Sequence, residues 1–302
     1  MPVSTVEAGT ETGGRDGLVG TIAITGATGQ LGSRVARMLA AGGVAQRLVV
    51  RDAARAPQLE GAEVAEASYR DEAAMRAALS DVDVLFLVSA HEGADRMPEH
   101  RAAVRAAAAA GVDRVVYTSF MGAAPHATFP FAREHSLTEQ LIDQAGLRLT
   151  ALRNSLYADV APHFVGADGV IRGPAGQGRI AWVARHDVAR LAVATLLDDS
   201  HADRIYDVSG ARPITLPETA RLLTEASGRE ITYYAETDEE ARASRAGAEE
   251  WQIAGWAGSY KAVATGETSV TSHTIEHVTG RPPWTFEEFL HHEPEAWRHL
   301  IP

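Results

Sequence analysis

The sequence contains no cysteine, and this absence excludes disulfide bonds, thiolate nucleophiles and cysteine-based metal sites. Lysine is almost absent as well, because Lys261 is the only one in 302 residues. No apolar run approaches the roughly 18 residues of a membrane helix, and the N-terminus lacks a basic region followed by an apolar core. We therefore expect a cytoplasmic protein without a membrane partner.

The chain is also poor in positive charge. It carries 28 lysine and arginine residues against 40 aspartate and glutamate residues, which gives a net charge of −12. An extended groove for nucleic acid needs a basic stripe, and the sequence has none, so we expect no nucleic-acid partner. The hydrophobic content of 45% is that of an ordinary globular chain. Residues 1–17 are polar, glycine-rich and without periodicity, and they are predicted to form a disordered leader.

From residue 18 onward, short apolar runs alternate with amphipathic stretches of about a dozen residues, which is typical of βαβ units around a parallel sheet. The predicted strands lie at residues 18–25, 46–51, 62–68, 83–89, 114–119 and 147–153. The predicted helices lie at residues 33–43, 71–80, 96–111 and 131–146. This alternation predicts an α/β fold with a Rossmann-like, doubly wound parallel sheet.

Three glycines separate the first predicted strand from the first helix, in the segment TGATGQLG. In this context backbone N–H groups and the helix N-terminus can receive a pyrophosphate. Gly26 permits the tight turn, Gly29 allows close approach of the phosphates, and Gly32 lets the helix pack on the strand. An ordinary turn is the alternative. The motif predicts a dinucleotide site with contacts from Gly26, Thr28, Gly29, Gln30, Leu31 and Gly32.

The end of the second predicted strand indicates which dinucleotide is bound. An acidic residue there would hold the 2′-hydroxyl of NAD, but this chain has Arg51. A guanidinium suits a 2′-phosphate through a charge-assisted hydrogen bond of about 1.5–3 kcal/mol, and Arg55 would assist it. A solvated surface arginine is the alternative, and neighbouring Asp52 leaves NADH open. We predict NADPH as the cofactor, with NADH as the second choice.

Regular alternation ends after Arg153. Residues 169–182 are rich in glycine and turn signals, and later segments predict two more helices and two more strands, at residues 186–199, 215–228, 203–210 and 231–236. Residues from about 237 onward are predicted to be mostly helical. We predict a dinucleotide-binding core at residues 18–153. Most of residues 154–302 are predicted to form a smaller C-terminal substrate-binding lobe, whereas segments at about 180–210 return and pack on the core.

The scarcity of lysine now bears on the chemistry. Many reductases protonate a carbonyl with a Y-x-x-x-K pair, in which the lysine lowers the pKa of the tyrosine. Ala257 stands four residues before Lys261, so this pair is absent. Either another acid serves, or the substrate needs no strong acid because its reduced anion is already stabilised, as that of a quinone or a conjugated dye would be.

Four segments carry a family resemblance: YTSFMGA, FAREHSLTEQLIDQAGLRLTALRNSLYAD, GQGRIAWVARHDVARLA and TGRPPWTFEEFL. In this order and at these distances they resemble the NmrA-like branch of the atypical short-chain dehydrogenases/reductases. Within that branch the chain is most similar to type 2 NAD(P)H:quinone reductases and triphenylmethane reductases. The resemblance spans about residues 21–290. It implies an NADPH-dependent reductase that passes hydride directly to a quinone-like or other conjugated aromatic substrate.

The resemblance also implies site residues. Arg51 matches the group's arginine for the 2′-phosphate, and Val88, Ser89 and Ala90 match the turn beside the nicotinamide ribose. His135 stands where isoflavone-reductase-like members have lysine. Asn154 and Tyr157 match positions that border nicotinamide and substrate. The loop at residues 124–131 and His91 depart from the family pattern, which leaves the substrate open.

Residue chemistry supports the same candidates. Ser89, Ser119 and Asn154 follow the ends of predicted parallel strands, at the edge that faces the ligand crevice, although each can instead cap a helix or turn. His135 is predicted to bond the nicotinamide ribose or donate a proton near neutral pH, and its alternative is a helix-face ion pair with Glu139. The predicted catalytic residues are His135, Asn154 and Tyr157. The predicted substrate contacts are His91, Phe120, Met121, Asn154 and Tyr157.

The sequence is compatible with two further functions and contains one motif that resembles a metal site. An NmrA-like cofactor-binding redox sensor without turnover would use the same glycine loop, and a tailoring reductase acting on a ketone, imine or enone would use the same cofactor. His273, Glu276 and His277 match the H-x-x-E-H zinc pattern, but the sequence offers no third ligand, so we expect no metal. A homodimer is compatible with the sequence, although no residue pattern argues for it.

Overall fold

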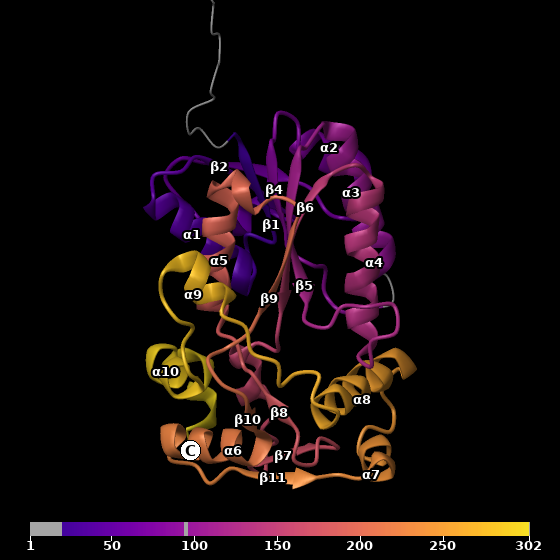
Figure 1. The fold of residues 1–302 in the computed structure, drawn as a ribbon, viewed down its shortest axis with the longest axis vertical. Helices are drawn as coiled ribbons and strands as arrows, with labels where there is room; N and C mark the ends of the chain where they lie inside the picture. Colours follow the sequence, from indigo (N-terminus) through magenta and orange to yellow (C-terminus); the bar gives the residue numbers. More distant parts are fainter. Residues whose placement is uncertain (1–19, 94–95, 302) are drawn as a thin grey trace, which may run out of the picture.

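The computed structural model describes residues 20–93 and 96–301, so the predicted leader lies outside the described residues. Seven parallel strands form a central sheet in the order β3-β2-β1-β4-β5-β6-β9 (Figure 1). The strands are β1 (Ile22–Thr25), β2 (Gln46–Val50), β3 (Ala62–Glu66), β4 (Val84–Leu87), β5 (Arg114–Phe120), β6 (Arg148–Asn154) and β9 (Arg204–Val208). The order reverses between β1 and β4, where a doubly wound sheet binds its ligands.

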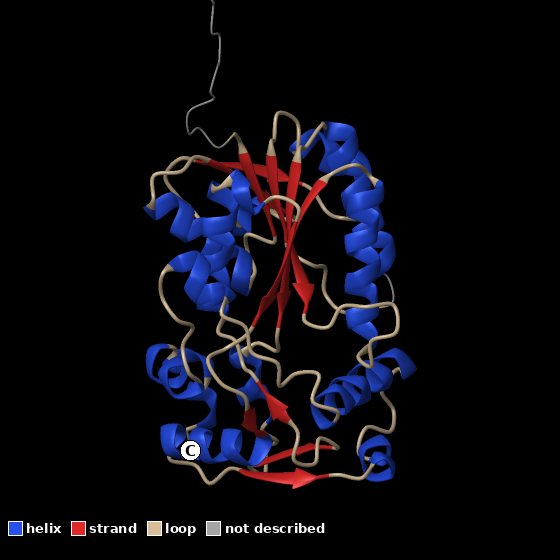
Figure 2. Ribbon diagram, in the orientation of Figure 1, coloured by secondary structure: helices blue, strands red, loops and turns tan. Residues whose placement is uncertain are grey.

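Helices cover both faces of this sheet, as Figure 2 shows. On one face α1 (Gln30–Ala41) packs against α5 (Arg185–Leu197), and α5 contacts α9 (Thr274–Thr279). On the other face α2 (Glu72–Ala78), α3 (Arg96–Ala110) and α4 (Pro130–Gln144) lie side by side. Because both faces are covered, β1 and β4 are buried at every residue and read as continuous apolar runs.

A smaller lobe lies beyond the carboxyl ends of the strands (Figure 1). It contains two short two-stranded sheets, a parallel pair and an antiparallel pair. The strands are β7 (Val170–Gly173) with β11 (Thr232–Ala235) and β8 (Arg179–Ile180) with β10 (Ile214–Thr215). Its helices are α6 (Leu216–Ser227), α7 (Asp238–Ala243), α8 (Glu250–Ala264) and α10 (Phe286–His292). A second apolar core, which includes Trp182, Tyr260 and Phe289, fills this lobe.

Contacts between distant segments join the lobe to the sheet. The side chain of Arg34 on α1 donates two hydrogen bonds to Glu293, at 2.6 and 2.8 Å. At the other end of the lobe, α8 packs on α4 so closely that a Cβ at Gly255 would lie 2.7 Å from the ring of Phe131. The described residues contain no helix long and apolar enough to cross a membrane.

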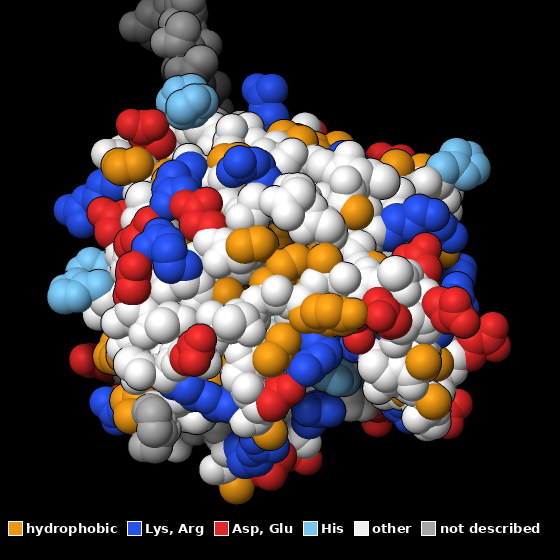
Figure 3. Space-filling view, turned by 90° about the horizontal axis from the view of Figure 1, so that it is seen from below, with side chains coloured by type: hydrophobic (Ala, Val, Ile, Leu, Met, Phe, Trp, Pro, Cys, Tyr) orange, Lys and Arg blue, Asp and Glu red, His pale blue; other side chains and the backbone are white. Residues whose placement is uncertain are grey.

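The face of the molecule seen in Figure 3 lies at the small-lobe end, and its charges are mixed. Arginine and acidic side chains lie next to one another there, with apolar side chains gathered between them. Arg212 illustrates the pattern, because it bonds both Glu218 of α6 and Glu287 of α10. Exposed pairs of this kind each contribute little to stability, about 0–1 kcal/mol.

The predicted α/β fold with a doubly wound parallel sheet is confirmed, and the predicted strands and helices of the core are all present within a few residues. The expected strand at residues 83–89 ends at Leu87, so Ser89 lies in the loop that follows. Residues 169–182, in which the sequence shows glycine and turn signals and no predicted strand, contain β7 and β8. These strands of four and two residues pair with partners far along the chain, so no local pattern marks them.

Candidate active site

The glycine loop turns from β1 directly into α1. Gly26 has a φ of +63°, which L side chains rarely adopt, and the Gly29 N–H donates to the Gly26 carbonyl at 2.8 Å. Gly29 is the N-terminal cap of α1 and has no side chain to satisfy the free N–H groups of the first turn. Gly26, Thr28, Gly29 and Gln30 are exposed, whereas Leu31 and Gly32 are buried. The loop therefore presents unpaired backbone donors and a helix N-terminus to an anionic ligand.

Arg51 lies in the bend after β2 and is exposed. Its guanidinium has no ion pair or hydrogen bond within residues 20–93 and 96–301. Tyr69 lies near it: burial raises the pKa of the Tyr69 phenol, and the Arg51 charge opposes that shift. A free guanidinium at the carboxyl edge of the sheet fits the 2′-phosphate role predicted for Arg51, which stays a prediction.

The Val88–Ala90 turn follows β4 and is tied down by side chains. The N–H groups of Val88 and Ser89 donate to the hydroxyls of Thr25 and Thr118, at 2.9 and 2.7 Å. The Ala90 N–H donates to Nε2 of His100 at 2.8 Å. The turn therefore has a fixed shape beside Gly26, whose added Cβ would lie 3.3 Å from Cβ of Val88.

Asn154 and Tyr157 lie together just beyond the end of β6. The Asn154 amide Nδ2 donates to the Tyr157 hydroxyl at 3.3 Å and approaches the Ser119 carbonyl at 3.5 Å. The Arg185 guanidinium lies 4.5 Å from the centre of the Tyr157 ring. Burial raises the pKa of Tyr157 to about 12, and Arg185 opposes that rise. The phenol is therefore protonated near neutral pH, and its proton has no acceptor among the described residues.

Two buried polar atoms at this edge are left without a partner in the described part of the chain: Oδ1 of Asn154 and Oγ of Ser155. Both residues are 2% exposed. An unpaired buried acceptor costs about 1–3 kcal/mol, and a polar ligand that donates to it removes this cost. Together with the glycine loop and Arg51, these atoms fit a dinucleotide whose polar nicotinamide end reaches Asn154.

Ser119 occupies a different environment from the one predicted. Its hydroxyl donates to Glu139 at 2.5 Å, and Glu139 also accepts two hydrogen bonds from Arg153, at 2.9 and 2.6 Å. The Ser119 side chain is thus engaged within the protein, while its carbonyl faces Asn154. In this structure the residue orients Asn154 through its backbone.

The predictions for His135 need correction. Glu139 bonds Arg153 and Ser119, and within residues 20–93 and 96–301 it makes no ion pair with His135, which was the alternative to a functional role for this histidine. Instead, Nε2 of His135 accepts from Arg96 at 2.7 Å, and Nδ1 contacts the Tyr117 hydroxyl at 2.8 Å. Burial, with the Arg96 charge, lowers the pKa of His135 well below its usual value, so the expected titration near neutral pH is wrong. Both ring nitrogens are engaged within the protein: because Nε2 accepts from Arg96, the one proton of the neutral ring lies on Nδ1, next to the Tyr117 hydroxyl.

The predicted substrate contacts differ in their exposure. His91 is exposed in the loop after the Val88–Ala90 turn, Phe120 is half-buried, and Met121 is 6% exposed. The Phe120 ring packs 4.9 Å from the ring of Phe129, and the Met121 N–H donates to the Asn154 carbonyl at 2.9 Å. Phe120 and Met121 therefore adjoin the Asn154 end of the site, and their contact with substrate stays a prediction.

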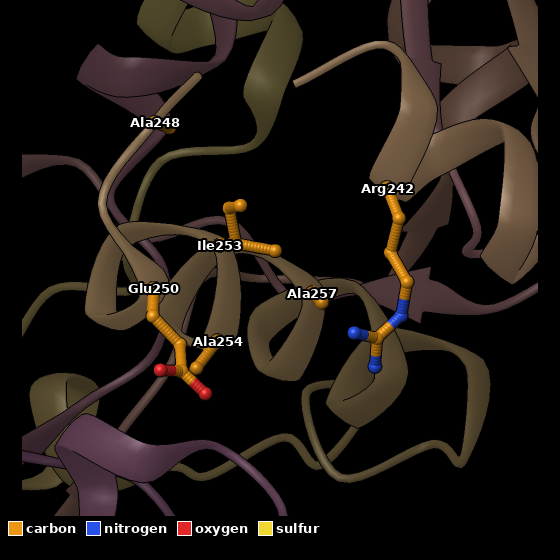
Figure 4. A pocket seen from close by; sticks show the side chains of 6 residues that line it. All are labelled: Arg242, Ala248, Glu250, Ile253, Ala254 and Ala257. Atoms are coloured by element: carbon orange, nitrogen blue, oxygen red, sulfur yellow. The ribbon is translucent and has the colours of Figure 1, made fainter. Parts of the chain in front are cut away.

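A cavity of about 320 Å³ lies elsewhere, between α7 and α8 (Figure 4). Figure 4 shows Arg242 and Glu250 at opposite sides of it, with the apolar side chains of α8 between them. Trp256 lines an adjoining cavity of about 210 Å³, whereas Trp251 packs on Phe131. No residue predicted for the site lines either cavity, so both are features of the small lobe alone.

The His273 motif shows no metal site. His273 is the N-terminal cap of α9, and its Nδ1 lies 3.5 Å from Glu276. Within residues 20–93 and 96–301, no group of three or more histidine, aspartate or glutamate side chains is arranged to hold a metal ion.

The buried histidines make a prediction about pH. Burial, with a smaller contribution from Arg96, lowers the pKa of His100 to about 3, whereas an unfolded histidine titrates near 6.5. The stability that depends on neutral His100 is therefore complete above pH 6.5 and is lost as the pH falls towards 3, by about 1.4 kcal/mol per pH unit. Urea unfolding at pH 7 and pH 5.5 measures this slope. A His100→Gln variant is expected to have a shallower slope, and equal slopes would refute the assignment.

These features define the class of protein. The strand order of the parallel sheet reverses at β1 and β4, and a glycine loop opens the helix that follows β1. Together with Arg51 after β2, which has no partner among the described residues, they are typical of a Rossmann-type dinucleotide-binding protein. Comparison with known proteins gives the family: residues 26–199 match the NAD(P)H-binding family, and the chain belongs to it.

Individual relatives narrow the comparison. The chain is 36% identical to quinone oxidoreductase 2 of Escherichia coli (strain K12) over 281 residues, which cover 90% of this chain and 98% of the relative. It is 30% identical to the NAD(P)H azoreductase of Xenophilus azovorans over 275 residues, covering 89% and 96%. The predicted place among NAD(P)H-binding, quinone-reductase-like oxidoreductases is confirmed.

Solved structures agree. The NADPH-dependent quinone oxidoreductase of Escherichia coli, crystallised with NADPH, superposes with a TM-score of 0.81 at 34% identity, covering 90% of this chain and 99% of that one. Triphenylmethane reductase of Citrobacter sp. superposes with a TM-score of 0.79 at 28% identity, covering 92% and 99%. Similarity to these enzymes extends over both the sheet and the small lobe.

Several residues of the site were missed in the sequence. Thr25 and Thr118 are polar residues in buried strands, and Arg96 and His100 lie four residues apart on one helix, where side chains share a face. Those signals are present in the sequence. Arg185, at the start of α5, carries no local signal of its position over Tyr157.

Proposed function

We propose that this protein is an NADPH-dependent reductase that delivers hydride directly to a quinone-like or other conjugated acceptor. The observation that carries the proposal is the pair of buried Asn154 and half-buried Tyr157 at the carboxyl edge of the sheet. Within the described residues, the amide oxygen of Asn154 and the phenol proton of Tyr157 have no partner. The quinone and azo substrates named for its relatives support this acceptor class. We further propose that the protein works in the cytoplasm and forms a homodimer.

Residues that would hold the cofactor lie along the carboxyl edge. The N–H groups of the glycine loop and the N-terminus of α1 would bind the pyrophosphate, Arg51 the 2′-phosphate, and the turn at Ser89 the nicotinamide ribose. Oδ1 of Asn154 would accept a hydrogen bond from the nicotinamide amide. When bound, NADPH supplies the hydride.

The chain's own contribution to the reaction is orientation and one proton. Reduction of a quinone to a hydroquinone takes one hydride, which carries both electrons, and one proton for the oxygen on which the negative charge develops. Tyr157 is placed to donate a hydrogen bond to one oxygen, because its own oxygen is held by Asn154. Arg185 stabilises the negative charge that develops there, since it lies over the Tyr157 ring. No Y-x-x-x-K lysine is needed, because the conjugated product stabilises its own anion.

The test of the function is NADPH oxidation with quinones, azo dyes, triphenylmethane dyes and enones, with cofactor binding measured in parallel. Turnover of quinones or dyes is the expected result. Turnover of enones alone would point to a tailoring reductase. Tight NADPH binding without turnover of any acceptor would overturn the proposal and favour a redox sensor.

Tyr157→Phe tests the proton donor. Losing one hydrogen bond to a developing negative charge is expected to lower kcat about tenfold, while KM stays close to that of the wild type because the ring is kept. Steady-state kinetics with the best quinone measures both constants. Tyr234→Phe is the matched control, because Tyr234 is exposed on β11 and bonds Glu240. An unchanged kcat would remove Tyr157 from the catalytic residues.

A further inference from the structure

We propose that Arg96 and His100 are positioning residues that hold the Val88–Ala90 turn in the shape that receives the nicotinamide half of the cofactor. Neither residue was among those predicted for the site. The inference rests on the proposed function of this edge of the sheet, and it concerns the side chains behind the turn rather than those that face the ligand.

Side chains from several elements replace the backbone partners that the turn has lost. Beyond Leu87 the strand pairing of β4 stops, and an unpaired buried N–H or C=O is costly. Thr25 of β1 and Thr118 of β5 take the first two N–H groups. The Val88 carbonyl accepts from the Tyr69 hydroxyl at 2.6 Å. The hydrogen bonds described for the turn therefore come from side chains, which makes its shape sensitive to single substitutions.

Ala90 is held at both of its backbone groups by one helix. Its N–H donates to Nε2 of His100 at 2.8 Å, and its carbonyl accepts from Nε of Arg96 at 3.2 Å. Arg96 and His100 are 3% and 0% exposed, and both lie on α3. Because they are one helical turn apart, they hold the N–H and C=O of one residue at the same time. Displacing either side chain leaves a buried backbone group of Ala90 without its partner.

The hydrogen bonds of His100 run in one direction and fix its tautomer. Nε2 accepts from the Ala90 N–H, so Nδ1 carries the proton and donates to the Thr138 hydroxyl at 2.8 Å. That hydroxyl in turn donates to the Glu134 carbonyl on α4 at 2.8 Å. Since burial lowers the pKa of His100 to about 3, the ring is neutral near pH 7 and Nε2 remains an acceptor there.

Arg96 is costly to bury, and its contacts show what it holds. The guanidinium donates to Glu134 at 2.9 Å and to His135 Nε2 at 2.7 Å, in addition to the Ala90 carbonyl. A buried ion pair is often no more stabilising than apolar side chains of the same size. Arg96 joins α4 to the turn through three directional bonds, which apolar side chains cannot do. This geometry favours a role in positioning over one in stability.

Ser89 is the residue of the turn whose side chain and carbonyl remain available to a ligand. Its N–H is held by Thr118, but neither its hydroxyl nor its carbonyl has a hydrogen-bond partner among the described residues. The turn therefore presents one acceptor and one hydroxyl to a ligand, from a backbone that His100 and Arg96 hold in place. A displacement of about 1 Å in a backbone segment that positions the reacting groups is enough to slow a transfer reaction about 100-fold.

His100→Leu and His100→Gln form the test pair. Leucine keeps the volume and removes both hydrogen bonds, whereas the glutamine amide can accept from Ala90 and donate to Thr138. In single-turnover measurements with a quinone, His100→Leu is expected to slow hydride transfer about tenfold and His100→Gln about twofold at most. Should leucine prevent folding, Thr138→Val replaces it, with an expected loss of about threefold because His100 loses only its orienting acceptor.

A binding readout separates this proposal from the function itself. His100→Leu is expected to weaken NADPH but to leave adenosine 2′,5′-bisphosphate, which lacks the nicotinamide half, within about twofold of the wild-type affinity. Thr150→Val is the stability control, because Thr150 is buried and bonds the His201 carbonyl at the far end of β6. Its transfer rate should match the wild type.

The outcomes are distinct. A wild-type protein without turnover contradicts the proposed function, and the two-ligand comparison still tests the turn. The positioning role is refuted if His100→Leu binds and reacts like the wild type, if both ligands weaken equally, if glutamine fails to rescue, or if Thr150→Val slows transfer as much.

Discussion

A Gly32→Ala variant is expected to weaken NADPH binding by at least about 100-fold, because it disturbs two or more phosphate-binding N–H groups that contribute about 1.5–3 kcal/mol each. A Cβ at position 32 would lie 2.3 Å from the Gly26 carbonyl oxygen and 2.7 Å from its carbon. Both are backbone atoms of the loop, so relief requires α1 to move away from β1. That movement takes the helix N-terminus out of register with the loop.

Fluorescence titration with NADPH measures this loss, and urea unfolding reports how far the fold itself is affected. Gly42→Ala is the matched control, because Gly42 lies at the other end of α1 and its Cβ would meet no atom closer than 3.4 Å. Its backbone φ of −83° also suits any residue. Wild-type affinity is expected there. Wild-type affinity in Gly32→Ala would contradict the cofactor site assigned to this loop.

Arg51→Ala is expected to remove most of the protein's preference for NADPH over NADH, so that the two cofactors bind with similar affinity. A charge-assisted bond to the 2′-phosphate is worth about 1.5–3 kcal/mol, which corresponds to a 10- to 100-fold weaker NADPH affinity with NADH almost unchanged. Arg51 has no partner in the described residues, so its removal leaves no buried group unpaired. Its loss should therefore leave the unfolding midpoint unaltered.

Arg37→Ala is the matched control, because Arg37 is an exposed arginine on α1 and its removal changes the net charge by the same amount. Dissociation constants for both cofactors, measured at one ionic strength, give the ratio that matters. If Arg51→Ala keeps the wild-type ratio, the arginine is only a surface residue and the cofactor preference has another origin.

Local features of the sequence predicted the cofactor end of the site. Gly26 and Gly32 lie within one turn between a strand and a helix, so their spacing alone carries the geometry. Arg51 follows its strand directly. Such features depend on neighbours in the chain, and the periodicity of the core elements is equally local.

Partners from distant elements explain what the sequence did not reveal. His135 meets Arg96 and Tyr117, which are 39 and 18 residues away, rather than Glu139 on its own helix. A histidine's pKa depends on such neighbours and on burial, so its usual value of about 6.5 misled the prediction. Arg185 and Tyr157 likewise come from different elements, so their contact could be found only from the structure.

The position of β9 has a consequence for how the chain is made. Its residues, Arg204–Val208, pair with β6 only after the intervening chain has entered the small lobe and returned through α5. During synthesis the edge of β6 therefore stays open until Val208 has left the ribosome, although the cofactor loop was completed long before. An exposed strand edge in a nascent chain invites aggregation. Fragments that stop after β6 are accordingly expected to precipitate, and expression trials of the cofactor-binding half should extend through β9.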